Sequence, residues 1–261
     1  NSENNRLSGG ATSDLRALRE YYAAPYRNVI ESANVSSLMT AYSTFNGEPC
    51  SASSYLMDTL VRQTYGFGGY VTSDCDSVSS LYRQNYTNPH TGKTLTTLEQ
   101  AISALSAGED LECTGGYDGG RASYSTNISK MVNSGAETDK GVFTENQVDV
   151  SLHRLLTARI KTGELDANNP YTAAAEERMK EDAVNGVQRQ TQERLDTADA
   201  VLKEAVVMLK NDHNVLPLNV GTNGAFKVVI VGSRQTDMYQ GVYSASVSGA
   251  NTVNIQKGIT E

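Results

Sequence analysis

Two acidic residues directly follow a predicted strand, and their position could support chemistry. The segment Tyr70–Thr72 favours a β-strand, and Asp74 and Asp76 come next, on either side of Cys75. Enzymes built on parallel sheets or barrels carry catalytic groups at the carboxyl ends of strands, because the loops there meet on one face. Asp74 is therefore a candidate functional acid. The alternative is a structural cap for the helix that follows.

Two other kinds of site fit the spacing less well. Gly232 ends an apolar strand candidate, but the next glycine is Gly241, so neither a dinucleotide fingerprint nor a P-loop is present. Cys75 could act as a nucleophile, but no partner base is identifiable. The histidines have no nucleophile elbow nearby, and they are His90 in a loop, His153 in a helix and His213 in a turn.

The composition limits the classes of partner. A formal net charge of -8 and a pI near 5.0 argue against nucleic acid or an anionic membrane surface. No apolar run approaches the roughly 18 residues that a transmembrane helix needs. The cysteines Cys50, Cys75 and Cys113 lack CxxC or zinc-like spacing, which leaves two possibilities: buried thiols, or one disulfide with a spare thiol.

Apolar periodicity and turn residues predict alternating strands and helices. We expect helices near 14–33, 53–65, 97–107, 144–162 and 195–209, and strands near 37–42, 69–72, 110–112 and 226–232, with a turn at 46–47. Alternation at about thirty residues per unit is typical of parallel βα repeats. A barrel needs eight such units, and three strands precede residue 113. The predicted α/β fold is therefore the late part of a barrel, or part of an open sheet.

Capping signals support these helices. Ser13 or Asp14 can cap the first one. Thr97 with Gln100, and Thr144 with Gln147, predict capping boxes, and Gly108 and Gly163 predict two helix ends.

The chain divides into three parts by composition. Residues 1–165 hold the predicted barrel units, 166–199 form a mostly polar linker that passes into a helix, and 200–261 begin a second α/β domain. The polar start and the abrupt end lead us to expect that this chain is a piece of a longer protein.

A series of motifs resembles glycoside hydrolase family 3, in the order that the family has them. They are Asn1–Arg6 (N-x-E-x-N-R), Met39–Gly47 (M-x-A-Y-x-x-x-N-G), Gly66–Asp74 (G-F-x-G-[FY]-V-x-S-D), Ala107–Leu111 (A-G-x-D-[LIM]), Val206–Asn211 with Leu216–Leu218, and Gly241–Ser244 (G-x-Y-S). The resemblance implies the C-terminal part of a (β/α)8 TIM-like barrel, followed by the start of an α/β sandwich domain.

The same resemblance implies a retaining exo-β-glycosidase with Asp74 as the nucleophile. Such an enzyme pairs its nucleophile with a protonated carboxyl about 5–5.5 Å away. The family's acid/base Glu lies beyond Glu261, so none is assigned here, and no cofactor or metal is implied. Arg6 corresponds to a sugar contact, Tyr42 to a neighbour of the nucleophile, and Met39 to a pocket wall. The glutamates predicted to be structural or solvated are Glu99, Glu109, Glu112 and Glu145.

The residue after the nucleophile bears on the substrate. Most β-glucosidases of the family place Trp there, whereas this chain has Cys75 and no Trp at all. The S-D-C-D-S-V sequence resembles a subgroup of β-xylosidases and arabinofuranosidases, in which this Cys can pair with a later one, here Cys113. Such a link would narrow the substrate pocket beside Cys75, so that a pentose fits better than a hexose.

We therefore expect hydrolysis of terminal non-reducing β-linked sugars in an oligosaccharide or aryl glycoside, by an exo-β-1,4-xylosidase. The alternatives are a β-glucosidase of the same family, an α-arabinofuranosidase side activity, and a sugar-binding protein without catalysis. The catalytic histidine motifs of relatives that remove N-acetylglucosamine are not found.

Overall fold

The computed structural model describes residues 5–84, 86–88, 92–113, 122–185, 192–218, 227–233, 236 and 253–260. Its contacts divide the chain into two units, Asn1–Gly186 and Val187–Glu261. Every residue that the sequence predicts for the active site lies in the first unit. No helix among the described residues is both long and apolar enough to cross a membrane.

Three parallel segments form the sheet of the first unit. β2 (Ser37–Met39) pairs with β5 (Tyr70–Thr72), and Thr72 pairs on the other side of β5 with Leu111. The N–H of Ser73 extends this pairing by donating to the Leu111 carbonyl over 2.8 Å. The parallel order predicted from βα alternation is confirmed, although β2 is shorter than predicted and the strand at 110–112 is a single bridge.

A second sheet, of three short strands, precedes β5 in the chain. β1 (Gly10–Ala11) pairs in parallel with β3 (Thr44–Phe45), which forms a hairpin with β4 (Glu48–Pro49). The hairpin turns at Asn46 and Gly47, with φ values of 50° and 84°. Asn and Gly tolerate this left-handed region, which is why this pair predicted a turn.

The first predicted helix is broken into three pieces. They are α1 (Leu15–Ala17), η2 (Leu18–Tyr22), which has wide π-type turns, and α2 (Ala24–Ala33). The break falls at Ala23, and Pro25 follows in the first turn of α2. Proline has no N–H and is tolerated only in a first turn, so a new helix must begin there.

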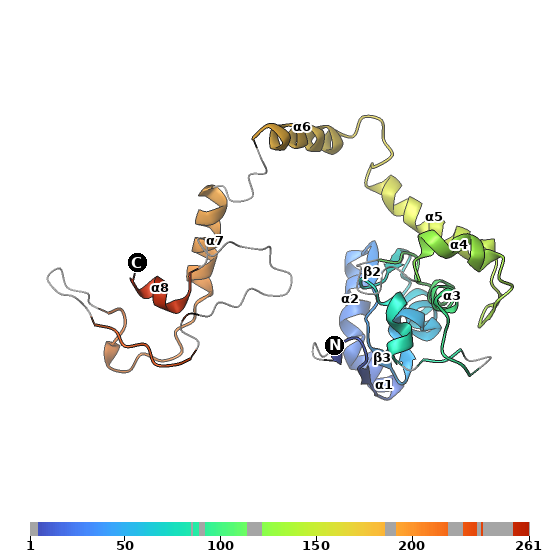
Figure 1. Cartoon of the computed structure of the whole chain (residues 1–261), viewed down its shortest axis with the longest axis horizontal. Helices are drawn as coiled ribbons and strands as arrows, with labels where there is room; N and C mark the ends of the chain where they lie inside the picture. The colour runs from blue at the N-terminus through green and yellow to red at the C-terminus, as the bar shows by residue number, and fades with distance from the viewer. Residues whose placement is uncertain are drawn as a thin grey trace. The chain divides into compact units, whose positions relative to one another are not determined.

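The remaining helices of this unit include the predicted ones near 53–65, 97–107 and 144–162. Four further helices were not predicted, at 50–52, 78–84, 124–132 and 170–185, and the last lies in the segment predicted as a linker. Figure 1 shows α3 (Thr97–Ala107), α4 (Tyr124–Val132) and α5 (Glu145–Lys161) gathered together, and α3 contacts both of the others. The elements are η3 (Cys50–Ala52), η4 (Tyr55–Thr64), η5 (Val78–Gln84), α3 (Thr97–Ala107), α4 (Tyr124–Val132), the hairpin of β6 (Glu137–Thr138) and β7 (Gly141–Val142), α5 (Glu145–Lys161) and α6 (Pro170–Asn185).

The capping box of α3 lies one residue earlier than predicted. Thr96, not Thr97, is the N-cap: its N–H donates to Glu99 Oε2 (2.8 Å), and the Glu99 N–H donates to Thr96 Oγ1 (3.3 Å). Gln100 is buried instead. Both registers fit the motif, but a carboxylate also interacts favourably with the positive end of the helix dipole, and the earlier register turns Gln100 toward the core.

Three other predicted caps are confirmed. Asp14 Oδ1 accepts from the Ala17 N–H (2.8 Å) at the start of α1. The Thr144 N–H donates to Gln147 Oε1 (2.9 Å) at the start of α5. Gly108 ends α3 with a φ of 115°, a conformation that favours glycine.

Two large apolar clusters lie among the described residues of the first unit, with a smaller third one at Ala52, Leu81 and Leu95. One joins η2, α2, η4 and β5 through Leu18, Ile30, Leu60 and Val71. The other joins α3 and α4 and includes the fully buried Phe143 after β7. Burial of apolar surface in the first cluster packs η2, α2 and η4 against β5, and in the second it packs α3 and α4 against each other.

The second unit contains α7 (Gln192–Ala205), η6 (Asp212–Asn214) and α8 (Ile255–Thr260). α7 ends earlier than the predicted helix 195–209. The predicted strand at 226–232 is wrong for its described residues, because 227–231 pair with no described segment and a strand requires a hydrogen-bonded neighbour. The segment 241–244 lies outside the described residues. The domain boundaries at 165 and 199, and the sandwich domain, stay predictions.

One buried carboxylate joins β5 to two helices. Asp110 Oδ2 accepts from Arg62 Nη2 of η4 (2.6 Å) and from the Val71 N–H of β5 (2.8 Å), and Oδ1 accepts from Arg154 Nη1 of α5 (2.8 Å). The Asp110 side chain is fully buried. Burial lowers the pKa of Arg62, and the charge of Asp110 opposes that shift.

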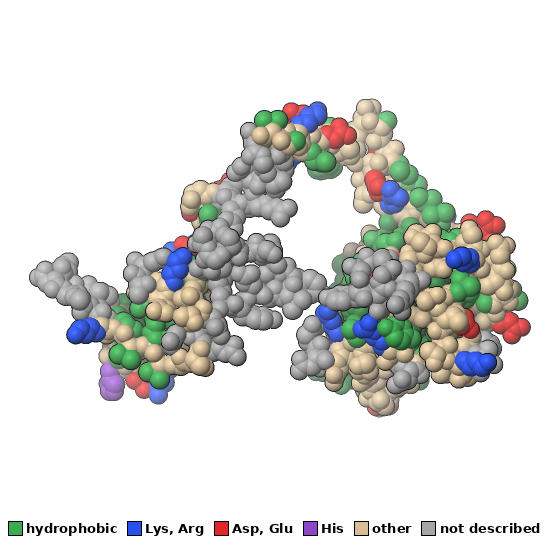
Figure 2. Space-filling view, in the orientation of Figure 1, with side chains coloured by type: hydrophobic (Ala, Val, Ile, Leu, Met, Phe, Trp, Pro, Cys, Tyr) green, Lys and Arg blue, Asp and Glu red, His purple; other side chains and the backbone are tan. Residues whose placement is uncertain are grey.

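This ion pair matters for α5, because little of that helix is buried. Ser151 is its one buried residue among those described, and Figure 2 shows hydrophobic side chains along its visible face. Leu152 and Ile160 are among the exposed ones. Arg154 therefore ties α5 to the sheet by charge where apolar contact is sparse.

Replacing Asp110 should test this tie. We expect Asp110→Asn to destabilise the protein by about 3–5 kcal/mol, because two arginines lose their shared buried counter-charge. Urea denaturation of the intact protein measures this. As a control, Glu20→Gln removes an exposed ion pair with Arg16 and should leave the urea concentration at the midpoint of unfolding nearly unchanged. Equal effects of the two changes would contradict a structural role for Asp110.

Candidate active site

The structure brings four predicted site residues into one connected group. The Arg6 guanidinium lies over the Tyr42 ring, 5.5 Å from its centroid. The Tyr42 hydroxyl donates to the Cys75 carbonyl, and the Cys75 N–H donates to Asp74 Oδ1 over 2.8 Å. Residues 33 positions apart in sequence therefore meet at the tip of β5.

Asp74 lies in a tight turn and does not cap a helix. Its carbonyl accepts from the Ser77 N–H (3.0 Å), and its carboxylate is partly buried. In the described part of the chain the carboxylate bonds no N–H of η5. Asp76 is buried with a φ of 63°, and its N–H donates to the Cys113 carbonyl over 2.8 Å. The cap alternative is therefore wrong, and Asp74 is left as the candidate functional acid.

A disulfide closes this turn against the neighbouring segment. Cys75 and Cys113 are joined, with their Cα atoms 4.5 Å apart. The Cys113 N–H also donates to Ser73 Oγ (2.8 Å). Cys50 is the free thiol of the three, and burial raises its pKa. The pairing implied by the family resemblance is confirmed.

Met39 lies in a different environment from Asp74. It is 62% exposed and borders an apolar hollow of about 260 Å³ between β2 and the helices η2, α2 and η4. Asp74 is not among the residues that line this hollow. The structure therefore describes no contact between the two, and the role of Met39 in a sugar pocket stays a prediction.

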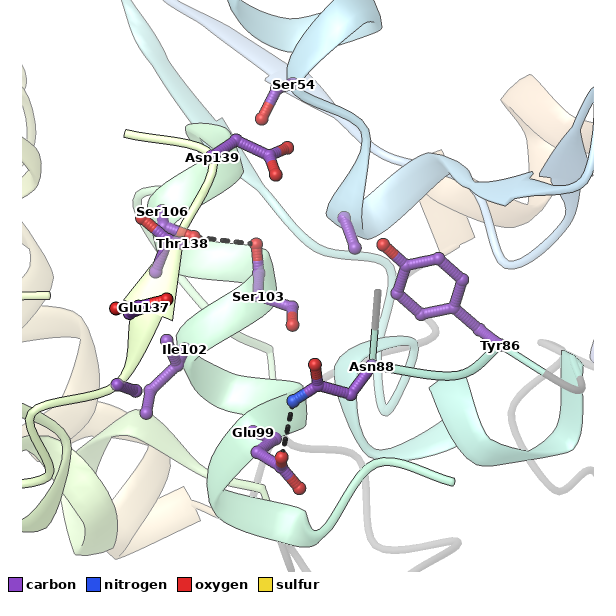
Figure 3. Close-up of a pocket in the computed structure, with 12 residues that line it drawn as sticks. Ser54, Tyr86, Asn88, Glu99, Ile102, Ser103, Ser106, Glu137, Thr138 and Asp139 are labelled. Carbon is purple, nitrogen blue, oxygen red and sulfur yellow. Dashed lines mark hydrogen bonds between the residues drawn. The ribbon is translucent and has the colours of Figure 1, made fainter. Parts of the chain in front are cut away.

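A second hollow, of about 320 Å³, lies between α3 and the β6–β7 hairpin (Figure 3). The Asn88 amide donates to Glu99 Oε1 across 2.6 Å at one end, and Tyr86 faces α3. Burial opposes ionisation of Glu99, but hydrogen bonds from Thr96 and Asn88 hold its pKa below the usual value. A carboxylate kept ionised in this way suits a helix cap better than a proton donor, in agreement with its predicted structural role.

Glu109 is the one described carboxyl whose pKa is strongly raised. It is fully buried, and burial raises its pKa to about 8, although the hydroxyls of Thr40 and Ser51 favour the charged form. The acids nearby, Glu112 and Asp110, raise it further, and Tyr124 faces the same residue, with its hydroxyl 3.3 Å from the Glu109 carbonyl. The predicted structural placement is consistent with this burial, but nothing in the sequence signals the raised pKa.

No described group of three or more His, Cys, Asp and Glu side chains is arranged to hold a metal ion. Of the histidines, His153 lies on the exposed part of α5, His213 lies in η6, and His90 falls outside the described residues.

The pKa of Glu109 makes stability depend on pH. Unfolded, the group titrates near 4.5, and folded near 8, so between these values the folded state holds more protons. The free energy of unfolding should therefore fall as pH rises from about 4.5 to 8, by at most about 1.4 kcal/mol per pH unit. Glu109→Gln should flatten this slope, whereas the exposed Glu145→Gln should not. Denaturation curves across this pH range check it, and identical slopes for wild type and Glu109→Gln would contradict it.

Comparisons with known proteins place the chain in a family. Residues 2–158 match the model described as the glycosyl hydrolase family 3 N terminal domain. A beta-xylosidase of Formosa agariphila is 30% identical over 243 residues, which are 92% of this chain and 31% of that protein. An exo-1,4-beta-xylosidase of Aspergillus awamori is 31% identical over 222 residues, which are 82% of this chain and 24% of that protein. The chain thus spans less than a third of the length of these relatives.

Solved structures of related glycosidases also superpose on this chain. A β-glucosidase from Erythrobacter marinus superposes with a TM-score of 0.58 at 26% identity, over 80% of this chain and 24% of that one. A family 3 exo-beta-xylosidase, in complex with a xylobiose aziridine probe, superposes with a TM-score of 0.50 at 25% identity, over 64% of this chain and 20% of that one. Together with the parallel order of β2, β5 and Leu111, these matches show that the chain belongs to glycosyl hydrolase family 3 and that its first unit is part of a TIM-barrel-like α/β fold.

Proposed function

We propose that the protein hydrolyses terminal β-linked xylose with retention of configuration, and that Asp74 is its nucleophile. The observation that carries this proposal is the turn at the tip of β5, where Asp74 is partly exposed, does not cap a helix, and is held through Cys75 and Ser77. Family membership supports the class of reaction.

The reaction takes two displacements. The Asp74 carboxylate attacks the anomeric carbon, the glycosidic bond breaks, and a separate carboxylic acid protonates the leaving oxygen. Water then attacks the anomeric carbon of the glycosyl ester, the bond from this carbon to the Asp74 oxygen breaks and frees the carboxylate, and the same second carboxyl, ionised by the first step, accepts the proton of the water. We propose no residue of this chain for the acid/base role.

The geometry suits Asp74 to this attack. The Cys75 N–H binds Oδ1 and fixes the plane of the carboxylate, while Oδ2 has no hydrogen-bond partner among the described residues. We propose Oδ2 as the attacking atom. A carboxylate that is already oriented loses less conformational freedom on reaching the transition state, which lowers the entropic part of the activation barrier.

Arg6 and Tyr42 are proposed as the neighbouring sugar-binding residues. Met39 is proposed as a wall of the sugar pocket on the family resemblance alone, because it borders a hollow that Asp74 does not line. The Arg6 guanidinium carries several N–H donors and lies over the ring of Tyr42, whose hydroxyl donates to the Cys75 carbonyl of the Asp74 turn. Hydroxyl-rich ligands such as pentoses are held by donors of this kind. Tyr42 also supports the turn through the Cys75 carbonyl.

The disulfide supports a pentose over a hexose. Cys75 follows Asp74 directly in the chain, and a disulfide joins it to Cys113. We propose that this disulfide narrows the space that a glucose hydroxymethyl group would need. The two relatives named as xylosidases favour the same substrate, while the match to a β-glucosidase structure keeps β-glucosides as the second candidate.

Hydrolysis of nitrophenyl β-xyloside, β-glucoside and α-arabinofuranoside by the intact protein tests the proposal. We expect the highest kcat/KM with the xyloside. Asp74→Asn should lower kcat by orders of magnitude, because an amide is a far weaker nucleophile. Asp76→Asn makes the same chemical change two residues away, in a positive-φ position that Asn tolerates, and should keep most of the turnover. Binding of sugar with no turnover by the wild type would instead indicate a non-catalytic protein.

Removing the disulfide should change sugar preference. The double variant Cys75→Ser with Cys113→Ser loses the sulfur link, so the ratio of β-glucoside to β-xyloside kcat/KM should rise. Cys50→Ser, which removes the free thiol, serves as the matched control and should leave this ratio unchanged. An unaltered ratio in the double variant would contradict the proposed steric role.

A further inference from the structure

Four buried polar side chains form a continuous chain of hydrogen bonds. Ser77 Oγ lies 2.7 Å from Ser51 Oγ, Ser51 Oγ lies 2.9 Å from Thr40 Oγ1, and Thr40 Oγ1 lies 2.7 Å from Glu109 Oε2. All four residues are buried, with Ser77 and Glu109 fully so. They come from four separate segments of the sequence and meet only in the folded unit.

The contacts run in order from Ser77 through Ser51 and Thr40 to Glu109. Either hydroxyl can donate in the Ser77–Ser51 and Ser51–Thr40 pairs, and the Thr40 hydroxyl can donate to Glu109 Oε2. Ser51 and Thr40 therefore each have a polar partner on both sides, and Glu109 is the last member of the chain.

The far end of this chain holds the turn that carries Asp74. Besides its hydroxyl contact, Ser77 donates its backbone N–H to the Asp74 carbonyl over 3.0 Å. We propose that Glu109 is a positioning residue for Asp74, acting through the ordered hydroxyls of Thr40, Ser51 and Ser77. This inference rests on the proposed function. It assigns to Glu109 a role in catalysis that involves no contact with the sugar.

The burial of Glu109 makes it hard to replace within this arrangement. Its Oε1 has no hydrogen-bond partner among the described residues, and its Oε2 accepts from Thr40. An apolar side chain here would remove the Glu109 partner of the Thr40 hydroxyl in a buried site, which favours reorientation of the hydroxyls along the chain. An amide oxygen could still accept from Thr40.

Kinetics of three variants of the intact protein test the proposal. Glu109→Leu should lower kcat on nitrophenyl β-xyloside about 10–100-fold with KM nearly unchanged, because small displacements of a reacting group cost rate more than binding. Glu109→Gln should restore kcat to within about threefold, since it keeps the acceptor. Gln100→Leu is the matched control: it is also buried with an unpartnered oxygen, but it bonds Leu95 and not the turn. It should keep wild-type kcat.

Ser77→Ala provides a double-variant cycle. If Glu109 acts through this chain, the combination of Ser77→Ala with Glu109→Leu should lose no more kcat than the worse single variant. Additive losses, or equal losses in Glu109→Leu and Gln100→Leu, would overturn the proposal.

A readout independent of turnover separates this inference from the proposed function. The rate at which dithiothreitol reduces the Cys75–Cys113 disulfide reports the mobility of the turn. We expect faster reduction in Glu109→Leu, and wild-type rates in Glu109→Gln and Gln100→Leu. If no glycoside is hydrolysed, the proposed function fails, while the reduction rates still decide whether Glu109 holds the turn. Equal rates in Glu109→Leu and wild type would overturn it.

Discussion

The buried carboxylate of Asp110 is the contact on which the arrangement of the first unit depends. It binds an N–H of β5, the guanidinium of Arg62 on η4 and that of Arg154 on α5. A single buried charge with three donors is costly to form and costly to break, so it selects one arrangement of strand and helices. Without it, β5 would lose the polar contacts that join it to these two helices.

The turn after β5 shows how such a scaffold can hold a reactive group. The turn residues 74–77 are joined to Tyr42, to Cys113 and to Ser51, each in a different segment of the chain. Loops usually move more than the strands they follow, and these contacts reduce that freedom. If Asp74 is the nucleophile, its position is set by contacts that surround it, and its own carboxylate needs only one hydrogen bond.

Much of the local structure could be predicted, and the errors have physical causes. The parallel order, the Asn46–Gly47 turn and most caps follow from periodicity and turn chemistry, which act within a few residues. The capping box of α3 was predicted one residue too late, because Thr96 with Glu99 and Thr97 with Gln100 both fit the sequence motif. The described part of 226–232 is apolar enough for a strand, but a strand also needs a partner, and apolar composition alone does not supply one.

The amino-acid sequence by itself determined the order of the βα units, the acid at the strand tip and, through its motifs, the family. Only the tertiary structure decided what surrounds that acid. Thr40 reaches Glu109 across 69 positions, and Asp110 binds arginines 48 and 44 positions away. Such contacts depend on how the helices pack against the sheet, and packing depends on the whole fold, so no local pattern encodes them. The raised pKa of Glu109 has the same origin, because burial is a property of the fold and not of the residue.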